Sequence, residues 1–219
     1  MSAPSLDEIT GAVIEAFPKL SVPERRVALA LYGLLAQGQP GTAEQISEAS
    51  EVSRAAVTEM LTKWHGVQRS ADGAVTGFWG LTLSKTKHRF RIGRRDLYTW
   101  CAWDTLFLPP LLDATAEVES ACQANCKPIT LRVSPRGVEA ASPESVALSF
   151  VMPREADIER NVIETFCCHV HFFASAQAGK QWIARRTGTF LLSLSDGWQI
   201  GLRKNFAQYE ATATLKSTS

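Results

Sequence analysis

The pattern of apolar and polar positions predicts helices through the first third of the chain. The apolar side chains of residues 1–20 fall on one helical face, which predicts an amphipathic helix. Pro18 is predicted to end this helix. A capping box at Ser21, in which Glu24 follows three residues later, predicts a second helix over residues 27–37.

Two shorter helices follow in the same pattern. A second capping box at Thr42 predicts a helix that ends near Ser50, and Ser53 is placed to cap another. Apolar residues of that last helix recur at i, i+3, i+4 and i+7 and form one stripe. The stripe consists of Val57, Met60, Leu61 and Trp64.

A β-hairpin is predicted after these helices. Strand-like residues at 67–70 and 78–83 flank a turn at Asp72-Gly73, and helices followed by a hairpin are the order of a winged-helix domain. Residues 85–95 then hold six Lys or Arg side chains and no acidic residue. This pattern favours a solvated edge strand, the return strand of the wing, over a strand that contacts phosphates.

From Asp96 onward the pattern changes to mixed helices and strands. A helix capped by Asp96 is predicted to run to Leu108, where Pro109-Pro110 ends it. The elements predicted after it are a segment at 116–126, strands at 129–133 and 146–151, helices at 158–163 and 180–186, and a closing hairpin of 190–194 and 198–202 around Asp196-Gly197. The residues after Tyr209 are polar and predict a frayed tail.

Residues 166–173 combine two adjacent cysteines and two histidines within an aromatic run. If this run is extended, successive side chains point to opposite faces, so that Cys167, His169 and His171 share one side and Cys168 lies on the other. Alternation alone does not choose between the two cysteines.

Three kinds of site remain open for these ligands. Zinc is one, but the spacing has no C-x-x-C pair, and Cys122-x-x-x-Cys126 is the only other close cysteine pair. Nucleophilic Cys-His chemistry is another, and it needs a third group to orient the base. Because thiolates select soft metals, converging cysteines also suit Cu(I) or a still softer ion.

A second candidate pair lies in the helix predicted to end at Leu108. Cys101 and Asp104 stand at i and i+3 there, so their Cβ atoms are expected about 5–6 Å apart, where the carboxylate can exchange a proton with the thiol. Taken alone, this spacing is also typical of a buried structural cysteine beside a locally bonded aspartate. We expect this stretch and residues 166–173 to form one thiol site for a soft metal.

Composition narrows the function classes. The 219 residues suffice for one large domain or two small ones, and a net charge of +1 gives no general attraction to nucleic acid or anionic lipid. The first residues lack the basic region and the apolar region of a signal peptide. No apolar run approaches the roughly 20 residues that span a bilayer. We therefore expect a cytoplasmic protein that does not associate with membranes.

The five cysteines are expected to be free or metal-binding, because an odd number in a reducing compartment argues against a disulfide framework. Cys167 and Cys168 are a poor disulfide pair. Their Cα atoms lie about 3.8 Å apart, below the usual minimum of about 4.4 Å.

Several stretches of the chain resemble the organomercurial lyases, the bacterial alkylmercury lyase family. They are residues 97–106, 131–135 and 165–175, together with the winged-helix front and residues 80–83. The similarity spans most of the chain and thins after about Gly188. The Cys-Cys-His-Val-His-Phe-Phe run is its most specific part.

The resemblance implies a catalytic set. The family cleaves the carbon–mercury bond by protonolysis, giving a hydrocarbon and Hg(II), and matching residue by residue places its two cysteines and its acid at Cys101, Cys167 and Asp104. The same three residues are implied to hold the Hg(II) product. Cys122 matches a third family cysteine that is usually taken as structural, and Cys126 has no match. His169 and His171 are interpreted as structural.

The resemblance also implies partners. The substrate is an organomercurial, small cellular thiols or mercuric reductase take the Hg(II), and no organic cofactor is required. The surrounding aromatic side chains are expected to hold the organic group and exclude water, although core packing explains most of them individually. They are Trp100, Trp103, Phe107, Phe166 and Phe172.

The predicted fold class is α+β, with a winged-helix-like three-helix domain at residues 1–95 and a mixed α/β catalytic domain of the alkylmercury lyase type at residues 96–219. The alternative function is a thiol-based metal sensor that binds DNA through its winged helix. The predicted recognition helix carries only Arg54 and Lys63 as cations, opposed by Glu59, and this favours the family's arrangement, in which the front domain covers the catalytic core.

Overall fold

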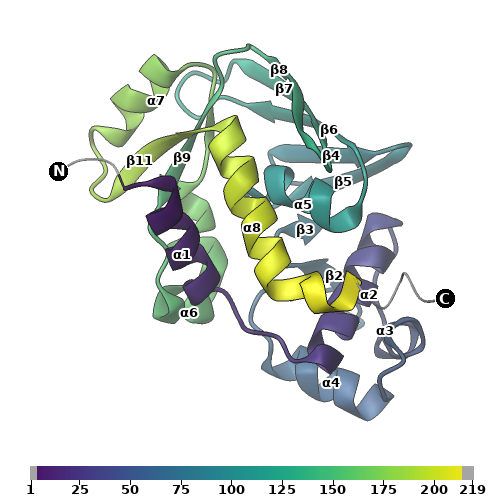
Figure 1. Ribbon diagram of the computed structural model, residues 1–219. Coiled ribbons are helices and arrows are strands. Elements are labelled where there is room, and N and C mark those ends of the chain that lie inside the picture. Colours follow the sequence, from purple (N-terminus) through teal and green to yellow (C-terminus); the bar gives the residue numbers. More distant parts are fainter. Residues whose placement is uncertain (1–3, 214–219) are drawn as a thin grey trace.

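The structure, a computed structural model, describes the backbone of residues 4–213 and the side chains of residues 4–209. It is a mixed α/β fold with an eight-stranded sheet and a three-stranded sheet, and every strand pairing in both is antiparallel. Figure 1 shows a long helix, α8 (Leu194–Ala213), running across the molecule in front of both sheets.

Four helices form the N-terminal part, and the start signals predicted for the last three are confirmed. They are α1 (Leu6–Ala16), α2 (Val22–Ala36), α3 (Ala43–Ser50) and α4 (Arg54–Lys63). The side chains of Ser21 and Thr42 each form a capping box with the residue three positions on, and Ser53 accepts a bond from the Ala56 N–H. These caps satisfy N–H groups that have no partner inside the helix.

The larger sheet contains all eight strands between residues 67 and 142. They are β1 (Val67–Arg69), β2 (Val75–Phe78), β3 (Leu81–Thr82), β4 (His88–Ile92), β5 (Arg95–Thr99), β6 (Ala116–Ala121), β7 (Pro128–Ser134) and β8 (Gly137–Ser142). Their order is β1-β2-β3-β5-β4-β6-β7-β8. The sheet continues through the expected domain boundary at residues 95 and 96, and the division into two domains remains a prediction.

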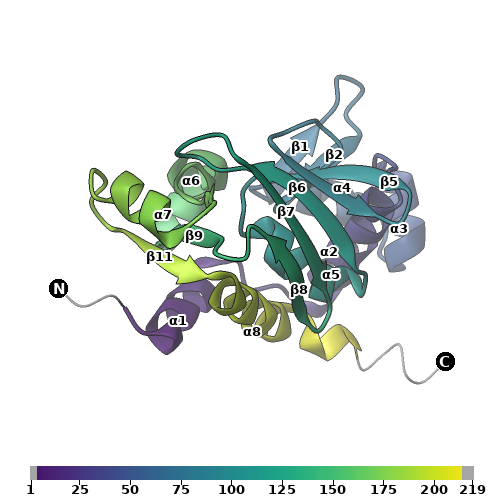
Figure 2. The ribbon, with the colours of Figure 1, turned by 90° about the horizontal axis from the view of Figure 1, so that it is seen from above.

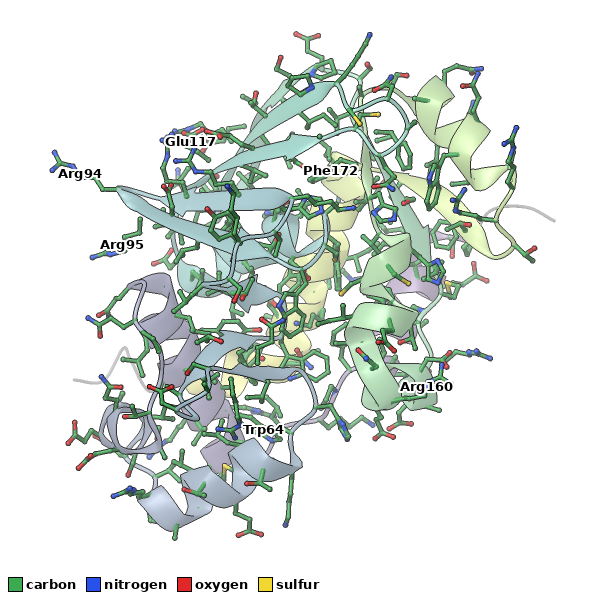
Figure 3. The ribbon with its side chains drawn as sticks, turned by 180° about the vertical axis from the view of Figure 1, so that it is seen from behind. Trp64, Arg94, Arg95, Glu117, Arg160 and Phe172 are labelled. Carbon is green, nitrogen blue, oxygen red and sulfur yellow. The ribbon has the colours of Figure 1, made fainter. Side chains whose placement is uncertain are left out.

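The sequence predicted that the basic segment at residues 85–95 forms an edge strand, and this prediction is wrong. It contributes β4, which is a central strand because its backbone pairs with β5 on one side and β6 on the other. Arg89 on β4 also forms salt bridges to Asp96 on β5 and Glu119 on β6. Arg94 and Arg95 project from the end of the β4–β5 hairpin (Figure 3). Three of the six cations that suggested an edge are therefore placed at the tip or paired within the sheet.

The helix predicted over residues 96–108 was also placed wrongly. Residues 95–99 form β5 instead, because pairing with β4 and β3 satisfies their backbone, and α5 (Asp104–Leu112) begins later. This helix continues through Pro109 and Pro110, which the sequence predicted to end it, at the cost of the hydrogen bonds that their missing N–H groups would donate.

The smaller sheet has the order β10-β9-β11. Its strands are β9 (Ala147–Val151), β10 (Phe172–Phe173) and β11 (Thr189–Ser193), and the helices beside it are α6 (Glu155–Thr165) and α7 (Ala176–Ile183). Figure 2 shows α6 and α7 on the same side of the molecule as β9 and β11, away from α2, α3 and α4.

Of the C-terminal hairpin predicted around Asp196-Gly197, the first strand is confirmed as β11, but the turn and the second strand are wrong. Ser193 accepts a bond from the Asp196 N–H (3.0 Å) and donates its own O–H to the Asp196 carboxylate (2.7 Å), so these residues form the first turn of α8. This helix packs against α5, α1 and α2 (Figure 1). Residues 210–213 continue the helix, and the part of the predicted tail at 214–219 lies outside the described residues.

Buried apolar residues from both sheets and from seven of the eight α-helices form one connected core. In the described part of the chain, no helix is long and apolar enough to cross a bilayer.

Candidate active site

Cys101 and Asp104 lie where the chain passes from β5 into α5. Asp104 is the first residue of α5, and its carboxylate accepts a 2.7 Å hydrogen bond from the Cys101 N–H. Cys101 therefore precedes the helix instead of lying on it, but the predicted closeness of the thiol and the carboxylate is confirmed. The N-terminus of a helix also favours a negatively charged side chain.

The loop that carries Cys101 is fixed by backbone contacts on both sides. Thr99 donates its O–H to the Cys101 carbonyl (3.0 Å), and the Trp100 N–H donates to the Gly80 carbonyl (3.0 Å). Gly80 has a φ of +100°, and a Cβ atom there would lie 2.7 Å from Asp104 Cγ. Only glycine leaves room for the carboxylate at this position.

Cys167 lies in a 3₁₀ helix (Cys167–His169) and not in the extended run that the sequence predicted. Because such a turn rotates the chain by a third of a revolution per residue, adjacent side chains point in different directions. Cys167 is buried, whereas Cys168 is exposed and donates its thiol to the Glu164 carbonyl (2.8 Å). The structure thus distinguishes Cys167 from Cys168, which the alternation of side chains along an extended run could not do.

The Cys101 and Cys167 sulfurs and an Asp104 carboxylate oxygen all lie within 4.8 Å of one another. All three side chains are buried. Among the described residues, this is the only cluster of three or more Cys, His, Asp or Glu side chains close enough to hold one metal ion. Residues far apart in the chain are thus brought together as expected, while their catalytic roles remain a prediction.

Burial dominates the electrostatics of the cluster. It raises the pKa of Asp104 from 3.8 to about 6, against the opposing effect of hydrogen bonds from Cys101 and the charge of Lys204. Burial also raises the pKa of the Cys101 thiol well above its ordinary range. The hydrogen bond from Cys101 lowers the pKa of Cys167, but burial and the Asp104 charge outweigh it, so this pKa is raised as well. These shifts favour two neutral thiols in the cluster.

A small cavity of about 10 Å³ adjoins the cluster. It is lined by Phe17, Trp79, Gly80, Trp100, Asp104, Phe107, Val162, Phe166 and Cys167. Three of the five aromatic residues expected around the site line this cavity, whereas Trp103 and Phe172 do not. A space of this size holds about one water molecule, so an organic group can enter only if a wall moves.

The remaining cysteines and the histidines lie outside the cluster. Cys122 is buried and Cys126 is exposed, in a turn closed by a hydrogen bond from the Cys126 N–H to the Cys122 carbonyl (2.9 Å). The His171 ring nitrogen Nδ1 lies 2.9 Å from Lys87 Nζ. This partner agrees with the interpretation of His171 as a structural residue.

Sequence reasoning missed Phe17, Trp79, Gly80 and Lys204. Gly80 follows directly on an aromatic residue in a predicted strand, and an isolated glycine there is a signal of close approach by another group. Lys204 had no usable signal, because its segment was predicted to follow a hairpin and not to lie inside a helix. Phe17 was taken only as part of an amphipathic helix.

Comparisons with known proteins show the family of this chain. A family model described as MerB, alkylmercury lyase, matches residues 81–204. A protein of Streptomyces lividans named alkylmercury lyase is 38% identical over 171 residues, covering 78% of each chain. Relatives with the same name from Pseudomonas putida and Staphylococcus epidermidis are 36% and 34% identical, over 76% and 82% of this chain and 77% and 81% of their own.

The fold has a solved counterpart. A crystal structure described as the mercury-bound form of MerB2 superposes with a TM-score of 0.75 at 22% identity, covering 92% of this chain and 98% of that one. At this identity the likeness shows the fold. These comparisons give no support to the alternative of a DNA-binding metal sensor.

Proposed function

The chain belongs to the alkylmercury lyase family, and from that premise we propose that Cys101, Cys167 and Asp104 carry out its reaction. The protein is an organomercurial lyase, an enzyme that converts alkyl- or arylmercury to a hydrocarbon and Hg(II). The observation that carries the residue assignment is the buried cluster in which two thiols and one carboxylate lie within 4.8 Å of one another.

The reaction begins with transfer of R–Hg⁺ from a small thiol to one cysteine. The incoming mercury replaces the proton of that cysteine, and the proton leaves on the departing thiol, so the net charge of the site is unchanged. Mercury bonding favours the thiolate, which offsets the raised pKa of a buried thiol.

The second cysteine then joins the mercury and passes its proton to Asp104. An ordinary carboxylate is a weak base toward a thiol, but burial raises the pKa of Asp104 to about 6 and makes it a stronger one. The two sulfur ligands increase electron density on the carbon. Asp104 finally delivers its proton to that carbon, the carbon–mercury bond breaks, and the hydrocarbon leaves with Asp104 again ionised.

Hg(II) remains bound to Cys101 and Cys167, with Asp104 as an additional ligand. Small cellular thiols or mercuric reductase then remove it, and we infer from this route that the protein acts in the cytoplasm. Every proton and electron pair in this sequence comes from the substrate, a thiol or Asp104, so no organic cofactor is required.

The N-terminal part has a supporting role in this proposal. α2, α3 and α4 followed by the β1–β2 hairpin have the order of a winged helix, and we infer that this unit, over residues 1–95, covers the catalytic part at 96–219. Supporting contacts come from Tyr32 on α2, which donates its O–H to the Trp79 carbonyl (3.0 Å), and from Phe17, which lines the cavity beside Cys167.

The decisive experiment is benzene release from phenylmercury with an excess of a small thiol. Wild type is expected to release benzene, and Asp104→Ala and Cys101→Ser are expected to lose turnover. Asp104→Ala should still bind mercury, because both thiols remain. Cys168→Ser is the matched control, since it removes an adjacent but exposed thiol and should leave turnover unchanged.

Release that survives in Asp104→Ala would show that another group delivers the proton. Stoichiometric mercury binding by wild type without benzene release would refute the turnover itself.

A further inference from the structure

A second and larger pocket lies next to the active-site cavity. It encloses about 240 Å³, and Phe17 and Trp79 line both spaces. The rings of Phe17 and Trp79 lie with their centroids 5.5 Å apart. These two side chains therefore form the wall between the pocket and the cavity that holds Asp104 and Cys167.

The pocket is aromatic with a few charged groups. Its aromatic side chains besides the shared pair are Trp64, Phe78 and Tyr209, and its titratable side chains are Lys19, Glu24, Lys63, His65, Glu159, Lys204 and Tyr209. Most of the charges already have partners or face solvent. Glu24 accepts bonds from the N–H and O–H of Ser21, and Lys63 is paired with Glu59 at 2.6 Å.

Lys204 differs from the other charged groups of the pocket. Its side chain is 1% exposed, and within residues 4–209 it has no salt bridge or hydrogen bond to a protein group. Its ammonium instead lies 4.2 Å from the ring centroid of Phe107 and 5.2 Å from that of Phe17. The one opposite charge that acts on it is that of Asp104, which reaches it through space without a direct ion pair. A buried ammonium that no anion contacts directly is costly, and an anionic group that bonds to it would offset this cost.

The position of Lys204 links the two spaces. Phe107 and Phe17 both line the cavity beside Asp104 and Cys167, so the ammonium lies at the inner end of the pocket, close to where mercury would be bound. A ligand in the pocket could place an apolar body against the aromatic rings and an anionic group at Lys204, with its mercury toward the cysteines.

We propose that this pocket binds the carboxylate of an organomercury–thiol adduct through Lys204. The proposal rests on the lyase function above and names the form in which substrate arrives. The carboxylate belongs either to the thiol that carries the mercury or to the organic group. In both cases it forms a charge-assisted hydrogen bond with the Lys204 ammonium while mercury passes to the cysteines.

The test compares matched adducts in wild type and Lys204→Met. Phenylmercury is supplied with an excess of 3-mercaptopropionate, which carries a carboxylate, or of neutral 2-mercaptoethanol. Carboxyphenylmercury with 2-mercaptoethanol puts the carboxylate on the organic group instead. Release of benzene or benzoate gives kcat and KM for each adduct.

Lys204→Met is expected to raise KM about tenfold for one of the carboxylate adducts, and less than about twofold for the neutral adduct, as loss of one charge-assisted bond implies. A selective loss with mercaptopropionate assigns the carboxylate to the thiol, and a selective loss with carboxyphenylmercury assigns it to the organic group. Equal losses for all three adducts would overturn the proposal, because a purely structural effect, or an electrostatic effect on Asp104, does not discriminate between adducts. An unchanged KM for all three adducts would overturn it as well.

Arg203→Met is the control on the same helix. It also removes a cation, but Arg203 is exposed and paired with Asp7, so the adducts should not be distinguished. Methionine matches the length of lysine and fits among rings, and thermal unfolding of both variants checks the fold.

Binding of the same adducts, followed by fluorescence of Trp64 and Trp79, provides a readout without turnover. If wild type releases no product, the lyase function fails, yet a selective loss of carboxylate-adduct binding in Lys204→Met would still support the pocket.

Discussion

At the scale of a single residue, the proposed mechanism requires Asp104 to act as both a base and an acid. Its burial is what allows both roles, since a pKa of about 6 leaves it largely ionised at neutral pH while making its protonated form accessible. A carboxylate kept in an apolar site for this purpose reduces the stability of the folded protein, and the pH dependence of that effect has a definite sign.

We predict that Asp104→Asn abolishes turnover and stabilises the fold at neutral pH. Between about pH 4 and pH 6 the unfolded carboxyl ionises while the folded one stays protonated, so wild type loses stability as pH rises. A rise in pKa from 3.8 to about 6 corresponds to roughly 3 kcal/mol. Lys204, whose pKa burial lowers to about 7, titrates above this window. Urea unfolding of both proteins across this range measures the effect.

The prediction fails if the stability difference between wild type and Asp104→Asn is the same at both ends of that range. The asparagine can still accept the Cys101 N–H bond, so the comparison isolates the charge.

Gly80 supports the acid sterically. We predict that Gly80→Ala lowers kcat by at least tenfold, because its Cβ would displace the Asp104 carboxyl group, and that it costs about 1–3 kcal/mol through the strained φ. Steady-state kinetics and thermal unfolding measure the two effects. Gly73→Ala has a similar φ of +86° but open space around it, so it should cost stability without changing kcat.

At this scale the sequence predicted which side chains lie together better than it predicted the backbone that carries them. Cys101 and Asp104 were expected to be close, and they are, although the helix predicted to carry both begins only at Asp104, so that Cys101 precedes it. The choice of Cys167 over Cys168 came from the resemblance. A 3₁₀ turn depends on the tertiary contacts of the neighbouring segments, which an alternation pattern does not encode.

At the scale of secondary-structure elements, α8 determines how closely the site is enclosed. A Cβ on Gly201 would lie 2.4 Å from Phe107 Cβ, and one on Gly197 would lie 2.9 Å from a Leu106 methyl group. Glycine at both positions thus lets α8 approach α5. The Trp103 indole N–H donates to the Gly197 carbonyl (2.8 Å), and this bond fixes the contact.

We predict that Gly201→Ala destabilises the protein by about 1–3 kcal/mol and weakens turnover, because α8 must move away from α5 and carry Lys204 with it. Gly33→Ala is the matched control. Gly33 lies inside α2 with open space around its Cα, so alanine there should stabilise by about 0.5–1 kcal/mol. Chemical denaturation and benzene release measure both variants, and equal effects would contradict the close-packing argument.

The sequence failed on this element for a physical reason. Asp196-Gly197 between apolar runs is a strong hairpin signal, but the Ser193–Asp196 pair caps a helix instead. Whether these residues form a helix or a strand then depends on the packing of Gly197 and Gly201 against α5. This contact joins segments that are far apart in the sequence, so a local pattern does not encode it. The N-terminal helices were predicted well because their capping boxes are local.

At the scale of the whole molecule, the eight-stranded sheet joins the N-terminal part to the part that holds the active site. The basic β4–β5 hairpin is thereby built into the sheet centre, with Arg89 paired on both sides and Arg94 and Arg95 at the hairpin tip (Figure 3). With a net charge of +1, the chain as a whole has no general attraction to nucleic acid.

We predict that the protein does not bind duplex DNA with the steep salt dependence of a regulator, with or without mercury. Arg94→Ala combined with Arg95→Ala removes the exposed cations of the hairpin tip and should leave benzene release unchanged. Electrophoretic mobility shifts at low and moderate salt, beside turnover assays, measure both. Salt-sensitive DNA binding lost in the double variant would contradict this expectation.

The late position of α8 in the chain has a consequence for biosynthesis. A ribosome adds about 5–20 residues per second from the N-terminus, so both thiols and the acid leave the exit tunnel before the helix that packs on α5. During that interval Cys101 and Cys167 belong to an unfinished enzyme that can capture mercury without its complete surroundings. We expect other cellular thiols, by competing for mercury, to limit such capture until synthesis ends.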